Sequence, residues 1–404
     1  MSISGAKRII NRVLLRARAL IVGSPFLRRF RTRICRIDCH LLEGKTKGNG
    51  RELRALFFGR SESLHYLIDL IYSELHQTKS FGRTTLKNAI SLSEEIPSDV
   101  VFAEFEGVIS NALSRHFLIL PHLTWTMDIT PSLEILISKM KRLRRRCMRV
   151  IQESHYTYEY TNSADKFDFF YDRMYVPYVS RKHGESSTIV SKERSREKFQ
   201  RSGLFLVKSG EEYVSGILFS RKNRTLQCEL LGMSHGNGRE LAGQAALLGL
   251  IKWAKEEGFT QIDYGRTMPF ASDGLFWYKR TWGMQIEPLS DLAFGIHLRT
   301  LSDGVLDFLA SNPFVFVCSS DLTILALLDL ADIDPKALYR RYYSSGLRRL
   351  VVIHQMDNAK MRGMSLPENV LERSLATYLQ FEELQKKNYC AHVLTFDEST
   401  RLST

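Results

Sequence analysis

The sequence of 404 residues is poor in cysteine, has no long hydrophobic run and has no acidic residue before Asp38. Its six cysteines are Cys35, Cys39, Cys147, Cys228, Cys318 and Cys390. Their irregular spacing excludes a disulfide framework, and no apolar segment with a cleavage site opens the chain, so we expect a reducing compartment. No run of about 18 apolar residues is present, which excludes a membrane-spanning helix. We therefore expect a cytoplasmic protein, either soluble or peripheral on the inner face of a membrane.

The charge of the chain is strongly positive, with 57 lysines and arginines against 44 acidic residues. A formal net charge of +13 favours an anionic partner, such as nucleic acid, a phosphorylated cofactor or a membrane surface. Ten of the cations lie between Met1 and Ile37, and over residues 7–22 they share one face of a helical wheel whose other face is apolar. This N-terminal arm, residues 1–36, fits three interpretations: a helix lying in an anionic membrane interface, a basic helix docked on the protein, or an organellar targeting segment.

The chain is too long for one ordinary core, so we expect two domains or fused half-domains with an extension. Residues 37–130 have a mixed α/β pattern. It predicts a buried strand over 53–59, a helix over 61–75, and further strands near 100–105 and 116–120.

Two short patterns in this region suggest ligand sites that we reject. The segment EGKTKG at 43–48 resembles a phosphate loop, but Cys39 stands where the first glycine of that motif belongs. Cys35, Cys39 and His40 are metal-ligand types, but no second ligand pair follows at zinc spacing. We therefore expect no metal site.

Two helices carry the chain into its second half. The first begins near Thr130 and Pro131, and the second covers 165–183. The buried stripe of the first consists of Leu133, Leu136, Ile137, Met140 and Leu143. Its outer face is predicted to carry Lys139, Lys141, Arg142, Arg144, Arg145, Arg146 and Arg149. These seven cations form either a solvated face or a phosphate-binding surface.

A regular series of elements follows. Antiparallel strands are predicted at 203–208, 213–219 and 225–232, then a polar glycine-rich loop at 233–243 that leads into a helix ending at Gly258. Next come a strand over 261–267, a short helix with the sequence DGLFWYKR, and a closing pair of strands, MQIEPLS and DLAFGIHL. Residues 300–404 are predicted to form an α-rich extension that includes an amphipathic helix over 366–384.

The order βββ, α, β, α, β resembles the GNAT-like N-acyltransferases, and in particular their FemABX branch. The resemblance covers about Trp125 to Leu298, and its carrying segments are YDRMYVPYVSRKHG (171–184), GFTQIDYGRT (258–267) and LFWYKRTWG (275–283). It implies two tandem GNAT-like lobes, residues 37–130 and 131–299, with mixed, largely antiparallel central sheets.

The resemblance also implies an activity. It predicts transfer of an acyl or aminoacyl group from acyl-CoA (acetyl-CoA) or aminoacyl-tRNA to an amine or hydroxyl of a cell-envelope or polysaccharide precursor. Tyr278 and Lys279 would be the catalytic pair, with Lys279 stabilising the oxyanion of the tetrahedral intermediate.

Donor binding is expected at the loop that precedes the long helix, because free backbone N–H groups at a helix start bind phosphate. The expected residues are His235, Gly236, Gly238, Arg239, Gly243 and Gln244. One departure weakens the CoA assignment: Glu240 stands where CoA-dependent members have Arg or Gln.

The remaining candidates lie at strand ends. Glu229, His235, Asp263 and Asp273 are candidates for a general base, of which Asp263 is preferred. Strand alternation predicts that Tyr264 and Arg266 share a face and bind substrate, with Arg266 on an anionic group. Asp273 and Arg280 complete the predicted substrate-binding set.

The competing hypothesis is a catalytically inactive GNAT-like module that binds RNA or an anionic membrane through its basic faces.

Overall fold

The computed structural model describes residues 36–106, 117–183, 189–235, 241–318, 321–328, 334–355, 380–387 and 389–395. The N-terminal arm up to residue 35 and most of the predicted helix 366–384 lie outside these residues. Among the helices of the described ranges, none is both long and apolar enough to cross a membrane.

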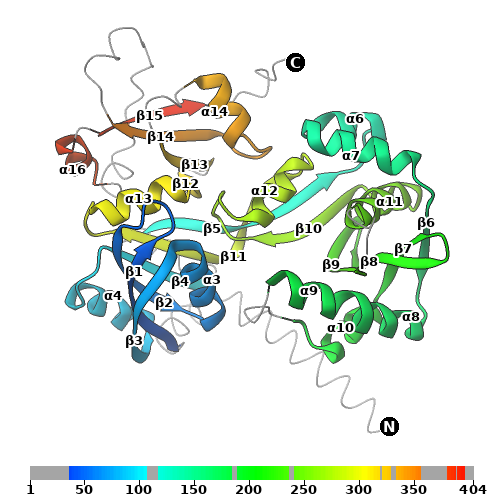
Figure 1. The fold of residues 1–404 in the computed structure, drawn as a ribbon, viewed down its shortest axis with the longest axis horizontal. Helices are drawn as coiled ribbons and strands as arrows, with labels where there is room; N and C mark the ends of the chain where they lie inside the picture. The colour runs from blue at the N-terminus through cyan, green and yellow to red at the C-terminus, as the bar shows by residue number, and fades with distance from the viewer. Residues whose placement is uncertain are drawn as a thin grey trace.

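One mixed sheet of eleven strands runs through the molecule (Figure 1). Its strands are β1 (Arg36–Thr46), β2 (Glu52–Gly59), β3 (Tyr72–Thr85), β4 (Val100–Glu106), β5 (Leu118–Asp128), β6 (Tyr156–Thr161), β7 (Ser202–Ser209), β8 (Glu212–Lys222), β9 (Thr225–Met233), β10 (Gln261–Thr267) and β11 (Gln285–Leu298). They lie in the order β3-β1-β2-β4-β11-β5-β10-β9-β8-β7-β6. Its neighbours are antiparallel except for β2–β4 and β9–β10. The predicted fold class, mixed α/β with a largely antiparallel sheet, is confirmed.

Strand β11 connects the two halves of this sheet. It pairs with β5 along both of its ends and with β4 through Leu292–Leu298. The sequence predicts two closing strands here, but there is one strand whose register against β5 shifts between Pro288 and Ala293. The irregularity interrupts the hydrophobic pattern and so resembles a turn in the sequence.

Helices cover both faces of the sheet. They are α3 (Ser61–Ile71), α4 (Leu86–Glu95), α6 (Leu133–Lys139), α7 (Arg142–Glu153), α8 (Ala164–Phe169), the π-helical segment η1 (Phe170–Tyr175), α9 (Val176–His183), α10 (Lys192–Phe199), α11 (Ala242–Glu256), α12 (Gly274–Thr281), α13 (Asp303–Ser311), α14 (Pro335–Tyr342) and α16 (Phe381–Lys386). Over the second half, α6, α7, α11 and α12 pack on one face, and α8, η1, α9 and α10 pack on the other.

Three helices of the structure differ in detail from those predicted from the sequence. The helix 61–75 ends at Ile71, where the chain continues directly as β3. The helix near Thr130 is two helices, capped by Ser132 and broken at Lys141, so Leu143 is exposed and Arg144 is buried, opposite to the predicted stripe. In the helix 165–183 the π-helical turn precedes Pro177, whose missing N–H cannot complete a regular ladder.

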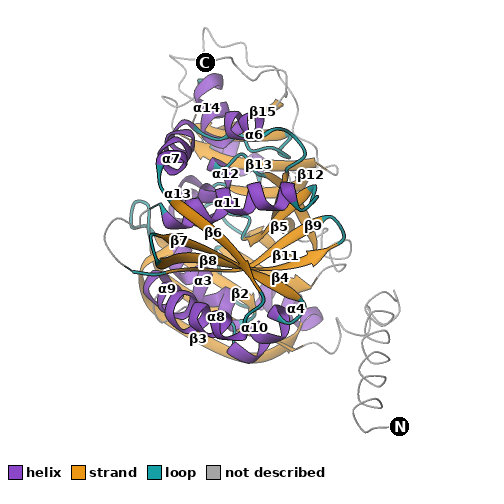
Figure 2. Ribbon diagram, turned by 90° about the vertical axis from the view of Figure 1, so that its right-hand side faces the viewer, coloured by secondary structure: helices purple, strands orange, loops and turns teal. Residues whose placement is uncertain are grey.

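Within its described residues, the C-terminal extension combines the helices α13, α14 and α16 with more strand than its sequence predicts. It contains a second sheet of four strands, β12 (Phe314–Cys318), β13 (Asp321–Leu328), β14 (Arg349–Gln355) and β15 (Tyr389–Thr395), in that order. In both views it lies beyond α13, away from α8 and α10 (Figure 1 and Figure 2).

The sequence predicts a strand at β13 but a helix at β14, and burial on both faces explains the latter. Along β14, Leu350 and Val352 pack into the core of the second half, whereas Val351 and Ile353 pack into the core of the first half. A strand buried on both sides is a continuous apolar run, which periodicity alone cannot distinguish from a buried helix.

Candidate functional site

The parallel strands β9 and β10 pair over one short stretch and then part. The paired residues are Gln261–Asp263 of β10 and Thr225–Gln227 of β9. Beyond this stretch Gly265 has a φ of +77°, a conformation that favours glycine. The register of β10 against β5 also shifts between Asp263 and Arg266. This bulge ends the ladder between β9 and β10, so the two strands separate beyond Asp263.

Helix α12, which follows β10, is fixed at its first turn and over its buried face. The carboxylate of Asp273 caps it by accepting hydrogen bonds from the backbone N–H groups of Leu275 (2.6 Å) and Phe276 (3.4 Å). The Phe276 ring packs edge-on against Trp125, with centroids 5.0 Å apart. The hydroxyl of Tyr66 on α3 donates to Asp273 at 3.0 Å. Asp273 therefore caps α12 and connects it to the first half of the molecule; its predicted substrate contact stays a prediction.

Lys279 reaches from α12 to the bulge of β10. Its side chain is 6% exposed, and its ammonium group donates to the carbonyl oxygens of Gly265 and Arg266, both at 3.0 Å. Burial lowers the pKa of Lys279 to about 8, although the nearby Cys228 and Asp263 favour the charged form. At neutral pH the amine is therefore still mainly a cation, held where the strands part.

Asp263 lies on β10 at the last paired position. Its Oδ1 accepts hydrogen bonds from the backbone N–H of Gly265 (2.8 Å) and the Thr124 hydroxyl (3.2 Å). Its Oδ2 accepts one from the Gln227 amide at 3.3 Å. These three donors hold the carboxylate in one orientation, as a base or charge-stabilising group requires.

Asp263 belongs to a row of polar side chains that crosses five strands, which we call the polar strip. Its members are Ser220 of β8, Gln227 and Glu229 of β9, Asp263 of β10, Thr124 and Thr126 of β5, and Glu287 of β11. Neighbouring members are hydrogen-bonded across the sheet. Glu229 also forms an ion pair with Lys198 of α10. The strip supplies three carboxylates on a sheet face beside the strand separation.

Tyr264 and Tyr278 lie on the core side of the place where β9 and β10 separate. The guanidinium carbon of Arg144 is 4.5 Å from the centre of the Tyr278 ring, and burial raises the pKa of Tyr278 to about 12. Burial likewise raises the pKa of Tyr264 well above its ordinary value. The Tyr264 hydroxyl has no hydrogen-bond partner within the described residues. A buried hydroxyl in this state is able to bond a ligand polar group.

Helix α11 begins at the end of β9, where the Ser215 hydroxyl of β8 donates to the Ala242 carbonyl at 2.7 Å. Its first turn contains no acid. Gly243 lets the helix pack on β9, because a Cβ there would lie 2.6 Å from the sulfur of Met233. Gln244 lies in the first turn. The backbone N–H groups of this turn are the kind that bind phosphate.

Part of the predicted donor loop is outside the described residues. Gly236, Gly238 and Arg239 lie there, as does Glu240, and His235 is the exposed residue that precedes them. Their predicted role in donor binding stays a prediction.

The predicted shared face of Tyr264 and Arg266 was wrong. Tyr264 is buried in the core, whereas Arg266 is exposed, because the bulge at Gly265 interrupts the alternation of the strand. Arg280 donates to the carbonyl oxygens of Tyr343 (2.8 Å) and Arg340 (2.6 Å). These bonds attach α12 to the C-terminal extension.

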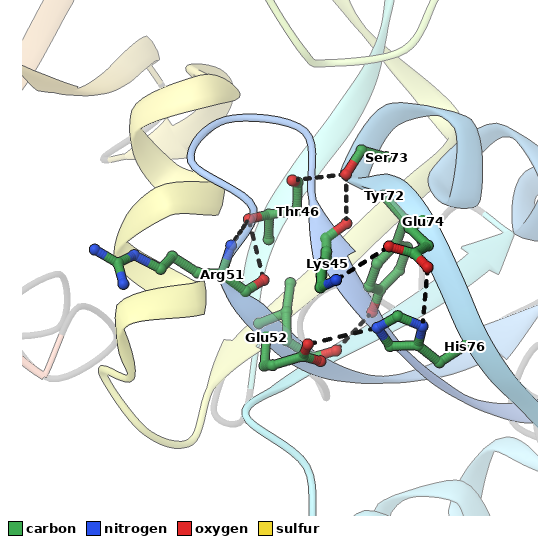
Figure 3. Close-up of polar contacts among 9 residues, drawn as sticks. Lys45, Thr46, Arg51, Glu52, Tyr72, Ser73, Glu74 and His76 are labelled. Carbon is green, nitrogen blue, oxygen red and sulfur yellow. Dashed lines mark hydrogen bonds and ion pairs between the residues drawn. The ribbon is translucent and has the colours of Figure 1, made fainter.

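The EGKTKG segment forms the end of β1 and the turn into β2. The Thr46 hydroxyl donates to the Arg51 carbonyl (3.2 Å) and accepts from its N–H (3.0 Å), and Lys45 forms an ion pair with Glu74 at 3.2 Å (Figure 3). His76 lies between Glu52 and Glu74. The side chains of a phosphate loop would face a ligand, whereas these close a hairpin.

Sequence reasoning missed several members of the site. Thr124, Thr126, Gln227 and Glu287 were not singled out, nor was Arg144 as a contact of Tyr278. Polar residues at every second position of apolar strands, as in Thr124-x-Thr126, were the available signal. Among the described residues, no group of histidine, cysteine or acidic side chains could hold a metal ion.

Comparison with known proteins gives similarity in structure alone. No family model matches the sequence, and no curated protein matches it. A crystal structure of FemX is similar with 15% identity and a TM-score of 0.37, over 63% of this chain and 83% of that one. L-PGS from Bacillus licheniformis is similar with 13% identity and a TM-score of 0.33, over 67% and 88%. A GCN5-related N-acetyltransferase from Kribbella flavida has 11% identity and a TM-score of 0.26, over 60% and 80%.

These superpositions are too loose to support an argument about activity. The fold assignment rests on this chain's own strand order: three antiparallel strands, a helix, a strand that parts from its parallel neighbour, a short helix and a closing strand. The second half of the chain therefore has the GNAT-like order of elements that its sequence predicts.

Proposed function

We propose that this protein is an acyltransferase that moves an acyl or aminoacyl group from an activated carrier to an amine. One observation carries the proposal: the separation of β9 and β10 has a fixed cation, Lys279, and a fixed carboxylate, Asp263, beside it. The start of α11, whose first turn contains no acid, lies at the end of β9 on the same face of the sheet as α12. This combination provides the three requirements of acyl transfer, which are a place for a phosphorylated carrier, positive charge for an oxyanion, and a proton acceptor.

The chemistry follows from these groups. The acceptor nitrogen attacks the carbonyl carbon of a thioester or ester, the new C–N bond forms, and the C–S or C–O bond to the carrier breaks. Negative charge that develops on the carbonyl oxygen is stabilised by the Lys279 ammonium. The proton lost by the acceptor nitrogen is taken up by Asp263 or by water. No covalent intermediate with the protein is required.

The acceptor is proposed to be an amine or hydroxyl of a cell-envelope or polysaccharide precursor, and the three carboxylates of the polar strip favour the amine because they attract its protonated form. Acyl-CoA and aminoacyl-tRNA both remain candidate donors. Both carry phosphates that suit the start of α11.

Donor binding tests the proposal through the first turn of α11. The Gln244→Glu variant places a carboxylate where a donor phosphate would bind, and Gln244→Ala is its uncharged control. An acid in the first turn stabilises a helix, so the charged variant should fold at least as well as the wild type.

Thermal stability should then be measured with acetyl-CoA, longer acyl-CoAs, CoA and charged tRNA at increasing concentration, since a ligand of the native state raises the melting temperature. We expect a saturable rise with one donor class for the wild type and Gln244→Ala, and none for Gln244→Glu. If none of the donors raises the melting temperature of the wild type, the proposal is rejected.

A further inference from the structure

Helices α6 and α7 present one outward face on which cations and apolar side chains lie together. Its exposed cations are Lys139, Arg142, Arg146 and Arg149, and its exposed apolar side chains are Ile135, Leu143 and Val150. At 100° per residue, the exposed cations and apolar side chains of α7 fall within an arc of about 120°, and the exposed Gln152 lies outside it. We call this surface the α6–α7 face.

The opposite side of α7 is firmly attached, so its orientation is fixed. Met148 and Ile151 lie in the core of the second half. Arg144 is buried, donates from Nε to the Thr281 hydroxyl at 2.9 Å, and stacks on the ring of Tyr278. The exposed side chains therefore face outward because the inward side is occupied.

The charge of the α6–α7 face is compensated only in part, by Asp128 near Lys139 and by the exposed Glu134 of α6. None of the ion pairs in the described part of the chain involves its four cations. Glu153 is the acid within the same arc of α7. A surface of this kind attracts phosphate-bearing partners, either lipid or nucleic acid.

The apolar side chains decide between these two partners. Ile135 is 50% exposed, Leu143 57% and Val150 44%. A nucleic-acid backbone offers aliphatic side chains nothing to bury against, whereas the boundary between lipid headgroups and acyl chains buries them. Leu143 and Val150 are seven residues apart and lie on the same edge of α7, as a helix lying in an interface requires.

We propose that the α6–α7 face docks on an anionic lipid bilayer, with its cations on the headgroups and Ile135, Leu143 and Val150 in the acyl boundary. This surface is separate from the N-terminal arm and from the acyl-transfer site. It would hold the protein at a membrane whether or not the arm binds there.

Vesicle binding by the full chain tests the proposal. Flotation with vesicles of phosphatidylcholine containing one third phosphatidylglycerol should be compared with pure phosphatidylcholine, and binding to total tRNA should be measured beside it. The variants are R142E/R146E/R149E, which reverses the charge, and L143S/V150S, which removes the apolar side chains. The matched control R194E/R201E/K222E makes the same change in net charge at exposed positions elsewhere.

Each cation near an anionic bilayer changes affinity by about fivefold, so the loss of three should weaken binding to anionic vesicles roughly a hundredfold. We expect L143S/V150S to lose vesicle binding and keep any tRNA binding, and the control to resemble the wild type on vesicles. The proposal is overturned if charge reversal on α7 weakens vesicle binding no more than the control does. It is equally overturned if L143S/V150S binds vesicles as the wild type does, or if charge reversal affects tRNA binding alone.

Discussion

Replacing Lys279 with methionine removes a buried ammonium group from the point where β9 and β10 part. In the folded protein the pKa of this amine is lowered from 10.5 to about 8, chiefly by desolvation. One pKa unit corresponds to about 1.4 kcal/mol, so holding the charged amine in this place costs about 3 kcal/mol of unfolding free energy below pH 8. Hydrogen bonds to two backbone carbonyls offset this cost in part.

The sign of the pH dependence follows from proton binding. Between pH 8 and pH 10.5 the folded chain has released the Lys279 proton while the unfolded chain still holds it. Stability rises with pH wherever the unfolded state binds more protons. From pH 7 to pH 9.5, the unfolding free energy of the wild type should therefore rise by about 2 kcal/mol relative to Lys279→Met.

Denaturant unfolding of both proteins at a series of pH values measures this difference, and the subtraction removes other titrating groups. Lys222→Met is the matched control, because it makes the same substitution at an exposed lysine. A difference between wild type and Lys279→Met that stays flat or falls as the pH rises would refute the burial of a charged amine at this site.

Three further substitutions test the surroundings of the site. Gly265→Ala should lower the unfolding free energy by about 1 kcal/mol, because its φ of +77° is strained for other residues; an unchanged melting temperature would contradict the bulge. Tyr66→Phe removes its hydrogen bond to Asp273 and should cost about 1 kcal/mol in urea unfolding, with no change in the slope. Glu104→Gln should cost about 3 kcal/mol, because Glu104 is a buried partner of Arg60. Hydrogen bonds lower the pKa of Glu104. Its contribution to the unfolding free energy should therefore persist at neutral pH and disappear as the pH falls below 4.5. A loss of stability in Glu104→Gln that does not depend on pH would count against the ion pair.

The sequence was sufficient to predict those elements whose residue pattern fits one type of secondary structure. Strands β7, β8 and β9 are short apolar runs separated by polar turns, and Gly258 follows the end of α11 with a φ of +80°, so their order was predictable. The element order led to the GNAT-like fold, and the resemblance of LFWYKRTWG to a pattern of that family led to Lys279.

The rest depends on tertiary packing that a pattern does not encode. Strand β14 of the extension is buried on both faces, so it could not be distinguished from a helix. The bulge at Gly265 separated Tyr264 from Arg266, which simple alternation had placed on one face. The partners of Arg280 lie about 60 residues further along the chain, beyond the reach of local reasoning.

Direct transfer of a labelled acyl group tests the central claim most directly. The wild type, Lys279→Met and the control Lys222→Met would each be incubated with acetyl-CoA labelled in the acetyl group, or with tRNA carrying a labelled amino acid. Glucosamine and a lysine-containing muropeptide would serve as acceptors. We predict that label moves to an amine acceptor with the wild type and the control, and at least about a hundredfold more slowly with Lys279→Met. Transfer from neither donor, or equal rates for all three proteins, would contradict the account.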